Sequence, residues 1–187
     1  MTPLKWVIAA VGLVAAAFIV VLAVQNVQQN GPNFDLVGKP VPPVQGISVN
    51  GESVDLDLTL QANRTKAPNE QTWTAVNFFA SWCSGCVVEH QALIQFTEEG
   101  AKGANGAQCS TQLLGVAFND EKEAVKGFFE KFGGDWPVLI GKETNQIAID
   151  FSVLTAPETF LVAPSGLIVL KVVGPVTYEK LIEGILC

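Results

Sequence analysis

An apolar run followed at once by two cysteines is the feature that most constrains this chain of 187 residues. The run, residues 75–80, is typical of a buried strand, and Cys83 and Cys86 follow it at the spacing of one helical turn. Cysteines at positions i and i+3 of a helix lie on one face, so they can close a small disulfide ring. The first meets the partial positive charge of the helix N-terminus, which favours a thiolate. The pattern predicts a redox-active cysteine pair where a strand meets a helix.

Half of a zinc site is the alternative interpretation of such a cysteine pair. Zinc in proteins usually needs four Cys or His ligands. The rest of the chain offers only His90, Cys109 and Cys187, with no second Cys-x-x-Cys pair. We therefore predict a redox pair, no metal and no cofactor.

The N-terminal segment predicts a membrane anchor. Residues 6–24 are uncharged and almost wholly apolar, and at about 1.5 Å per residue they nearly span a hydrocarbon core of about 30 Å. Lys5 precedes them and Asp35 is the first charged residue after them, so the positive-inside rule places the rest of the chain outside the cytoplasm. A cleaved signal peptide, cut near residues 21–23, is the alternative. We expect an uncleaved single-pass anchor over residues 1–24, with the remainder on the extracytoplasmic side, where disulfides persist.

The charge of the chain argues against one class of partner. Asp and Glu outnumber Lys and Arg by 18 to 11, which gives a net charge of −7, and no basic stripe interrupts the sequence. Nucleic-acid binding needs clustered positive charge, so we expect no nucleic-acid partner.

After a polar linker over residues 25–37, residues 38–187 have the pattern of one α/β domain. Asn50 and Gly51, between alternating residues, predict an N-terminal β-hairpin with strands at 47–49 and 53–56. The polar stretch 61–71 is expected to be a loop. Further strands are expected at 72–80, 111–118, 138–140, 158–162 and 167–173, and helices at 83–97, 121–132, 145–151 and 177–186. This order predicts a mixed sheet covered by helices on both faces.

Two segments resemble a known family. Residues 79–90, FASWCSGCVVEH, resemble the active-site segment of membrane-anchored thioredoxin-like proteins of the CcmG/DsbE, ResA and TlpA types, which act in cytochrome c maturation. Residues 155–160, TAPETF, resemble the cis-proline segment of the same family. The resemblance covers residues 38–187 and implies a thioredoxin-like fold with an extra α–β insertion between the two motifs. This chain departs from the family in lacking a proline between the cysteines and in having Thr155 where glycine is common.

The cysteines have distinct expected roles. Cys83 is the candidate nucleophile, which attacks a substrate disulfide, and Cys86 then attacks Cys83 to release the reduced substrate. An inert buried thiol is the alternative for Cys86. Trp82 is expected to shield the site and contact substrate, and a core aromatic residue is the alternative for it.

The second motif supplies the candidate substrate contact. The resemblance implies a cis bond before Pro157, which would present the backbone of Ala156 to an extended peptide. The alternative is an ordinary proline at the start of a strand.

Two glutamates are candidate catalytic residues. Glu89 follows Cys86 by three positions and shares its helix face, and Glu158 follows Pro157 directly. Carboxylates near a dithiol raise the pKa of its thiols, and a buried carboxyl group can carry the proton of Cys86. The resemblance implies that both glutamates are active-site residues; a solvated surface position is the alternative for Glu89. His90, the only histidine, is expected to be a partly buried helix residue.

Cys109 and Cys187 are both expected at the end of the sheet opposite the active site. They could form a second disulfide there, or they could be two unpaired thiols.

The resemblance implies a function in electron transfer to proteins. The chain would reduce the CxxCH disulfide of apocytochrome c before haem attachment and receive electrons from a membrane dithiol donor. The alternatives are an oxidase that introduces disulfides into secreted proteins, and a non-catalytic membrane-tethered module that binds CxxC proteins. A peroxidase on the related fold would have a Thr-x-x-Cys arrangement, whereas Ser81 and Trp82 precede Cys83 here.

Overall fold

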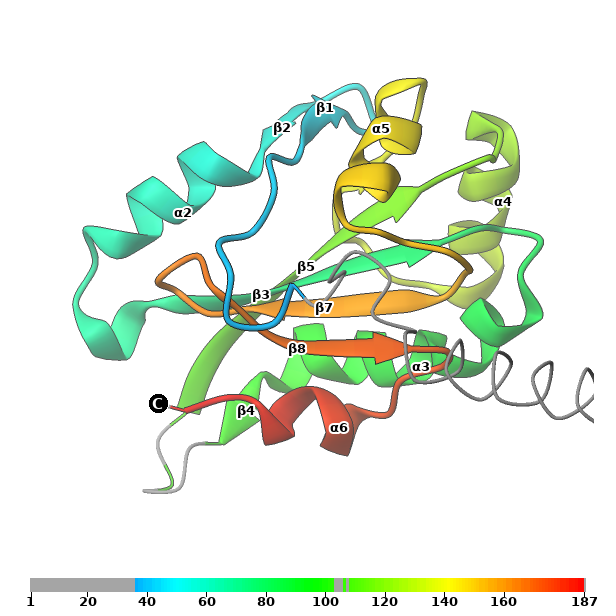
Figure 1. Cartoon of the computed structure of the whole chain (residues 1–187). Coiled ribbons are helices and arrows are strands. Elements are labelled where there is room, and N and C mark those ends of the chain that lie inside the picture. The colour runs from blue at the N-terminus through cyan, green and yellow to red at the C-terminus, as the bar shows by residue number, and fades with distance from the viewer. Residues whose placement is uncertain (1–35, 103–105, 107, 187) are drawn as a thin grey trace, which may run out of the picture. The chain divides into compact units, whose positions relative to one another are not determined.

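A computed structural model describes residues 36–102, 106 and 108–186. Figure 1 shows the elements in the order β1 (Gln45–Ile47), β2 (Ser53–Asp55), α2 (Leu56–Arg64), the 3-10 helix η1 (Pro68–Glu70), β3 (Thr72–Phe79), α3 (Ser84–Glu99), β4 (Ala101–Lys102), β5 (Gln108–Ala117), α4 (Lys122–Phe132), β6 (Val138–Leu139), α5 (Glu143–Asp150), β7 (Glu158–Val162), β8 (Ile168–Val173) and α6 (Tyr178–Glu183).

The central sheet is mixed, as predicted. Its strands lie in the order β4-β5-β3-β7-β8, and β6 also pairs with β5. Strand β3 is parallel to β5 and antiparallel to β7, so Asn77 is paired with Gly115 on one side and with Thr159 on the other. Because β3 and β5 are parallel, their C-terminal ends meet at one edge of the sheet, and the cysteine pair follows β3 at that edge.

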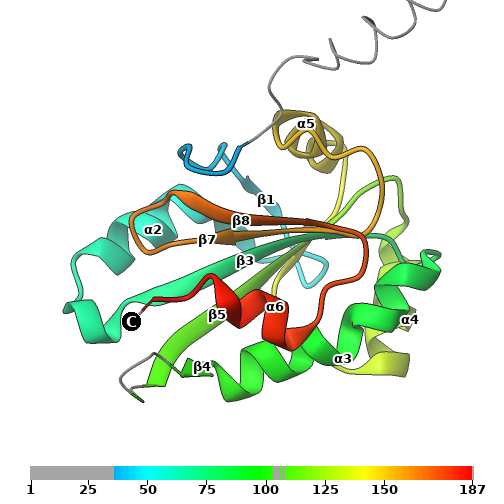
Figure 2. The same ribbon diagram turned by 60° about the horizontal axis from the view of Figure 1, so that its bottom comes forward.

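Helices cover both faces of the sheet, which confirms the layered arrangement expected from the sequence. Figure 2 shows α3 and α6 on one side and α2 and α5 on the other. Each side has its own apolar core. The first contains Ala75, Leu93, Phe96, Phe128, Leu161 and Leu181. The second contains Leu60, Val76, Phe78, Phe151, Phe160 and Val162. Alternate residues of β3 and β7 therefore belong to different layers.

One prediction for the N-terminal part was wrong. The β-hairpin around Asn50 and Gly51 is present as β1 and β2, but helix α2 begins at Leu56, where a strand was expected to end, and includes residues 61–64 of the expected loop. Asp55 caps this helix by accepting the Leu58 N–H at 3.1 Å. Leu56 and Leu60, one turn apart, are buried against the second core, so tertiary packing stabilises a helix in a sequence of low overall hydrophobicity.

Residues 38–41 lie along the outer edge of β8. The Gly38 N–H donates to the Ile168 carbonyl at 2.7 Å, and the Ile168 N–H donates to the Lys39 carbonyl at 2.9 Å. The Val41 N–H donates to the Gly166 carbonyl at 2.9 Å. This segment therefore covers the first part of an edge strand.

The predicted anchor over residues 1–24 and linker residues 25–35 lie outside the part of the chain that the structure describes. Within the described ranges, no helix is long and apolar enough to cross a membrane. The anchor stays a prediction.

Candidate active site

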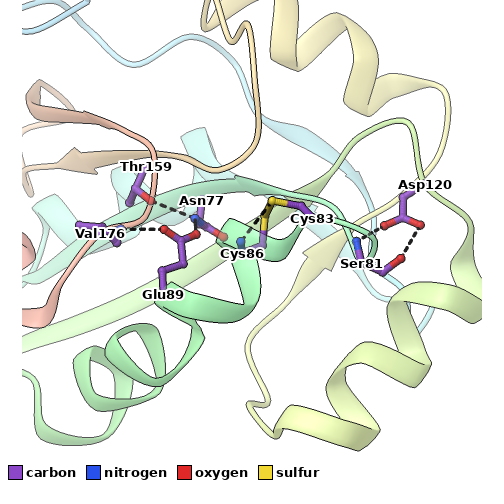
Figure 3. The surroundings of a disulfide bond; sticks show 8 residues. All are labelled: Asn77, Ser81, Cys83, Cys86, Glu89, Asp120, Thr159 and Val176. Carbon is purple, nitrogen blue, oxygen red and sulfur yellow. Dashed lines mark hydrogen bonds between the residues drawn. A yellow bond between two sulfur atoms is a disulfide. The ribbon is translucent and has the colours of Figure 1, made fainter.

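The two cysteines lie at the N-terminus of α3, where the sequence predicted them. Cys83 is the N-cap residue, and its Sγ accepts the Cys86 N–H at 3.2 Å. The two residues form a disulfide with Cα atoms 5.3 Å apart (Figure 3). Cys83 retains 7% of its surface and Cys86 only 2%. Cys83 therefore occupies the helix end that favours a thiolate, and Cys86 lies deeper.

The turn before Cys83 is fixed by the loop that follows β5. The carboxylate of Asp120 accepts hydrogen bonds from the Ser81 N–H and, at 2.9 Å, from the Ser81 hydroxyl (Figure 3). The Trp82 Nε1–H donates to the Asn119 carbonyl at 3.2 Å. Trp82 is 64% exposed, so it is a surface residue beside the disulfide and not a core aromatic residue.

The sequence analysis did not identify the contribution of Asp120 to the cysteine turn. The parallel pairing of β3 and β5 contains the missing signal, because the residues after both strands must then meet at one edge of the sheet.

Pro157 lies against the cysteine loop. The Ala156–Pro157 peptide bond is cis, as the resemblance implied. A Cβ atom built on Gly85 would lie 3.0 Å from Pro157 Cδ and 3.3 Å from Pro175 Cγ. These close approaches leave little room for a side chain at position 85, which accounts for glycine in the dipeptide between the cysteines.

Glu89 is a buried carboxyl group one turn beyond Cys86. It retains 1% of its surface, so the surface alternative is wrong. Its Oε1 accepts the Asn77 Nδ2–H at 2.8 Å and its Oε2 accepts the Val176 N–H at 2.9 Å (Figure 3). Burial raises the pKa of Glu89 to about 7, against the opposing effect of the two hydrogen bonds. Glu89 can therefore take up or release a proton near neutral pH.

Glu158 lies on the other face of the sheet. Alternation along β7 places it in the layer of Phe160, away from α3. Its Oε1 accepts the N–H groups of Leu154 and Thr155 at 2.8 and 3.2 Å, and its Oε2 lies 3.0 Å from Lys171 Nζ. Of the two predicted carboxyl groups, only Glu89 shares the dithiol's layer. Glu158 holds the loop that leads to the cis-proline.

His90 is a helix residue, as expected, but it is buried and not partly exposed, and it joins α3 to α4. Its Nε2 lies 2.8 Å from the Gly133 carbonyl, which can only accept, so Nε2 carries the hydrogen. Four aromatic rings surround it at centroid distances of 4.9–6.1 Å: Phe128, Phe129, Phe132 and Trp136. Burial lowers the pKa of His90 below its usual value of 6.5.

Within the described ranges, no group of three or more His, Cys, Asp or Glu residues is arranged to hold a metal ion. Cys109 is buried near the start of β5. Cys187 lies outside the described residues, so the pairing of these two cysteines stays a prediction.

A CxxC disulfide at a helix N-terminus, facing a cis-proline across the edge of a mixed sheet, defines the thioredoxin-like thiol–disulfide oxidoreductases. Residues 36–184 match the Redoxin family model, and the chain belongs to this family.

The names of curated relatives describe the same thiol–disulfide chemistry. The chain is 30% identical over 161 residues to the thiol:disulfide interchange protein HelX of Rhodobacter capsulatus, covering 84% of this chain and 81% of that protein. It is 30% identical over 144 residues to a DsbE homologue of Paracoccus denitrificans, covering 77% and 70% of the two chains. The Cys83–Cys86 disulfide and these relatives together identify the protein as a thiol–disulfide oxidoreductase.

Solved structures share the fold. The thioredoxin domain of a thiol-disulfide oxidoreductase from Bacteroides vulgatus superposes with a TM-score of 0.58 at 22% identity, over 79% of this chain and 93% of that one. A thioredoxin-family protein from Chlorobium tepidum gives 0.57 at 22% identity, over 78% and 92%.

Proposed function

We propose that this oxidoreductase reduces protein disulfides outside the cytoplasm, and that its substrate is the CxxCH disulfide of apocytochrome c before haem attachment. The resemblance of residues 79–90 and 155–160 to proteins of cytochrome c maturation supports the substrate. The relatives named DsbE and HelX support the same assignment. A membrane dithiol protein would return the enzyme to its reduced form.

The reaction begins at Cys83. Its thiolate attacks one sulfur of the substrate disulfide, forms a mixed disulfide and releases one substrate thiolate. The Cys86 thiolate then attacks Cys83 Sγ, which releases the second substrate thiolate and leaves the Cys83–Cys86 disulfide. Two electrons pass to the substrate. The proton of the Cys86 thiol goes to the carboxylate of Glu89, and the two substrate thiolates take their protons from water.

The buried carboxyl group of Glu89 is the observation that carries the direction of electron flow. A carboxylate one turn from Cys86 disfavours a neighbouring thiolate, because like charges repel in a buried site. Stabilised thiolates make a dithiol an oxidant, since they stabilise the reduced form. An environment that disfavours the thiolate therefore favours a reductant over an oxidase.

The decisive experiment is mixed-disulfide trapping with a CxxCH peptide of apocytochrome c in its disulfide form. Cys86→Ser should accumulate the mixed disulfide, because its Cys83 can attack but the intermediate cannot resolve. Cys83→Ser should accumulate none. A peptide with the same residues in scrambled order is the specificity control. Equal trapping by both variants would remove the assignment of roles.

Turnover and equilibrium measurements test the alternatives. A reductase is expected to reduce the peptide catalytically and to equilibrate with glutathione as a strongly reducing couple. Faster oxidation of reduced, unfolded protein than reduction of the peptide would favour the oxidase. Binding without turnover would favour the non-catalytic module.

A further inference from the structure

The loop between β8 and α6 contacts the two segments that border the disulfide, the cis-proline segment at Pro157 and the dipeptide between the cysteines at Gly85. The Gly174 N–H donates to the Pro157 carbonyl at 2.9 Å. The next residue, Pro175, lies against the cysteine loop, where a Cβ atom on Gly85 would approach its Cγ to 3.3 Å. Two consecutive residues of this loop therefore fix the cis-proline segment and the dipeptide between the cysteines.

The third residue of the loop reaches the buried carboxyl group. The Val176 N–H donates to Glu89 Oε2 at 2.9 Å, and Val176 is 3% exposed. Thr177 then caps α6, with its Oγ1 accepting the Lys180 N–H at 3.3 Å. The loop is thus held between the end of a strand and a capped helix, and it has little length in which to absorb a displacement at Val176.

The described groups that donate hydrogen bonds to Glu89 are neutral, so a change in its own ionisation acts directly on them. Asn77, on β3, and Thr159, on β7, form a neutral hydrogen-bonded pair next to it. Cys86 titrates only when the disulfide is reduced. His90 is directed to α4. Burial raises the pKa of Glu89, its two hydrogen bonds oppose that rise, and no charged side chain is among these causes.

We propose that residues 174–176 act as a positioning segment that couples the charge on Glu89 to the geometry of Pro157 and Gly85 beside the disulfide. A hydrogen bond to a carboxylate is shorter and about twice as strong as one to a neutral acceptor. Ionised Glu89 therefore draws the Val176 N–H inward, and protonated Glu89 relaxes it. Because Gly174 and Pro175 precede Val176 directly, the displacement reaches both contacts at the disulfide.

This coupling gives the proton transfer of the proposed reaction a second consequence. Glu89 receives the proton of Cys86 at the step that releases the substrate, so the segment relaxes as the product leaves. The inference rests on the dithiol chemistry of the proposed function but not on the identity of the substrate.

NMR titration of the oxidised protein between pH 5 and 9 tests the coupling without any substrate. The Glu89 carboxyl carbon reports its ionisation, and the amides of Val176, Gly174 and Gly85 report the segment and the cysteine loop. We expect all four signals to share one midpoint, and the three amide transitions to disappear in Glu89→Gln. If the Val176 amide follows Glu89 while those of Gly174 and Gly85 do not, the segment does not transmit the charge and the proposal is wrong.

A pair of proline variants tests the same coupling from the other side. Pro175→Gly loosens the segment and should raise the midpoint of Glu89, because the Val176 hydrogen bond favours the ionised form. Pro164→Gly, in the turn at the far end of the β7–β8 hairpin, should leave that midpoint unchanged. Equal midpoints in Pro175→Gly and wild type would overturn the proposal. Should Pro175→Gly not fold, the wild-type titration still decides. Loss of peptide reduction with an intact titration would refute the proposed function alone.

Discussion

At the scale of single residues, two buried glutamates differ because their partners differ. Glu158 faces the ammonium group of Lys171 and two backbone N–H groups. In the described part of the chain, Glu89 accepts hydrogen bonds only from neutral donors, those of Asn77 and Val176. Neutral donors offset only part of the cost of burying a charge, so Glu89 can hold a proton near neutral pH while Glu158 serves to fix a loop.

Replacing Glu89 should remove a pH dependence of stability. The pKa of Glu89 rises from 4.5 in the unfolded chain to about 7 in the folded protein. Between these values the folded protein holds a proton that the unfolded chain has lost, so the free energy of unfolding falls as pH rises, by about 3 kcal/mol in all. Urea unfolding of wild type and Glu89→Gln at pH 4.5 and pH 8 should differ by this amount, because only the wild type has the decline that Glu89 causes. The exposed Glu98→Gln on the same helix is the control and should keep the wild-type profile; the same change in stability between the two pH values in wild type and Glu89→Gln would contradict the prediction.

Removing Lys171 should destabilise the fold. Lys171→Met leaves the carboxyl group of Glu158 buried without its counter-charge, which we expect to cost about 2–3 kcal/mol of unfolding free energy because the lysine is only 19% exposed. Glu158→Gln combined with Lys171→Met should recover part of this loss. Lys180→Met, which breaks the exposed pair with Glu183, should cost less than about 1 kcal/mol. Similar losses in Lys171→Met and Lys180→Met would show that the Glu158 pair is not a buried one.

The spacing of residues in the chain predicted some of these roles and not others. Glu89 was found because three positions separate it from Cys86. The face on which Glu158 lies was not predictable, since all five residues of β7 are buried and a strand buried on both faces has no alternation to mark its orientation. The partners of Glu89 come from β3 and from a loop 87 positions away, and no local pattern signals such pairings.

At the scale of elements, His90 joins the cysteine helix to α4. Its neutral ring donates to Gly133 and packs among aromatic rings. These contacts tie α3 to α4, so the position of the cysteine helix depends on α4 as well as on β3. Helix α4 was predicted from its apolar face, but its contact with His90 depends on tertiary packing.

His90→Phe should remove a second pH dependence, of opposite sign. The pKa of His90 is lowered in the folded protein, so the unfolded chain binds a proton first as pH falls. The stability is fully present above pH 6.5 and is lost as pH falls from 6.5 toward the folded pKa. Because Glu89 acts in an overlapping range, the comparison is best made between Glu89→Gln and the double variant Glu89→Gln/His90→Phe. The double variant should lose the acid slope; an unchanged slope would mean that another group causes it.

Helix α2 shows what local patterns leave out at this scale. Asn50 and Gly51 marked the hairpin correctly because turn chemistry is local. The helix after it depends on Asp55 as a cap and on Leu56 and Leu60 reaching a core built by distant strands. The Asp55 cap and the leucines at positions i and i+4, taken together, are the sequence signal for helix α2.

At the scale of the whole molecule, we predict that the first 24 residues anchor the catalytic domain on the outer side of a membrane. We expect the chain produced in a bacterium to retain an N-terminus at residue 1 or 2, to fractionate with membranes and to display residues 38–187 to protease added outside the cytoplasmic membrane. N-terminal sequencing, fractionation and protease accessibility measure these three properties. A soluble product that begins near Val24 would identify residues 6–23 as a signal peptide.

Residues 38–41, which lie along β8, limit where an extended polypeptide could pair with the sheet. A bare strand edge offers free backbone groups to any extended polypeptide, and such edges are where sheet proteins self-associate. Residues 38–41 occupy part of that edge on one side of the sheet, and the short strands β4 and β6 occupy parts of the β5 edge on the other. At these positions the backbone groups of the two outer strands are already paired, so an extended polypeptide cannot add to the sheet there.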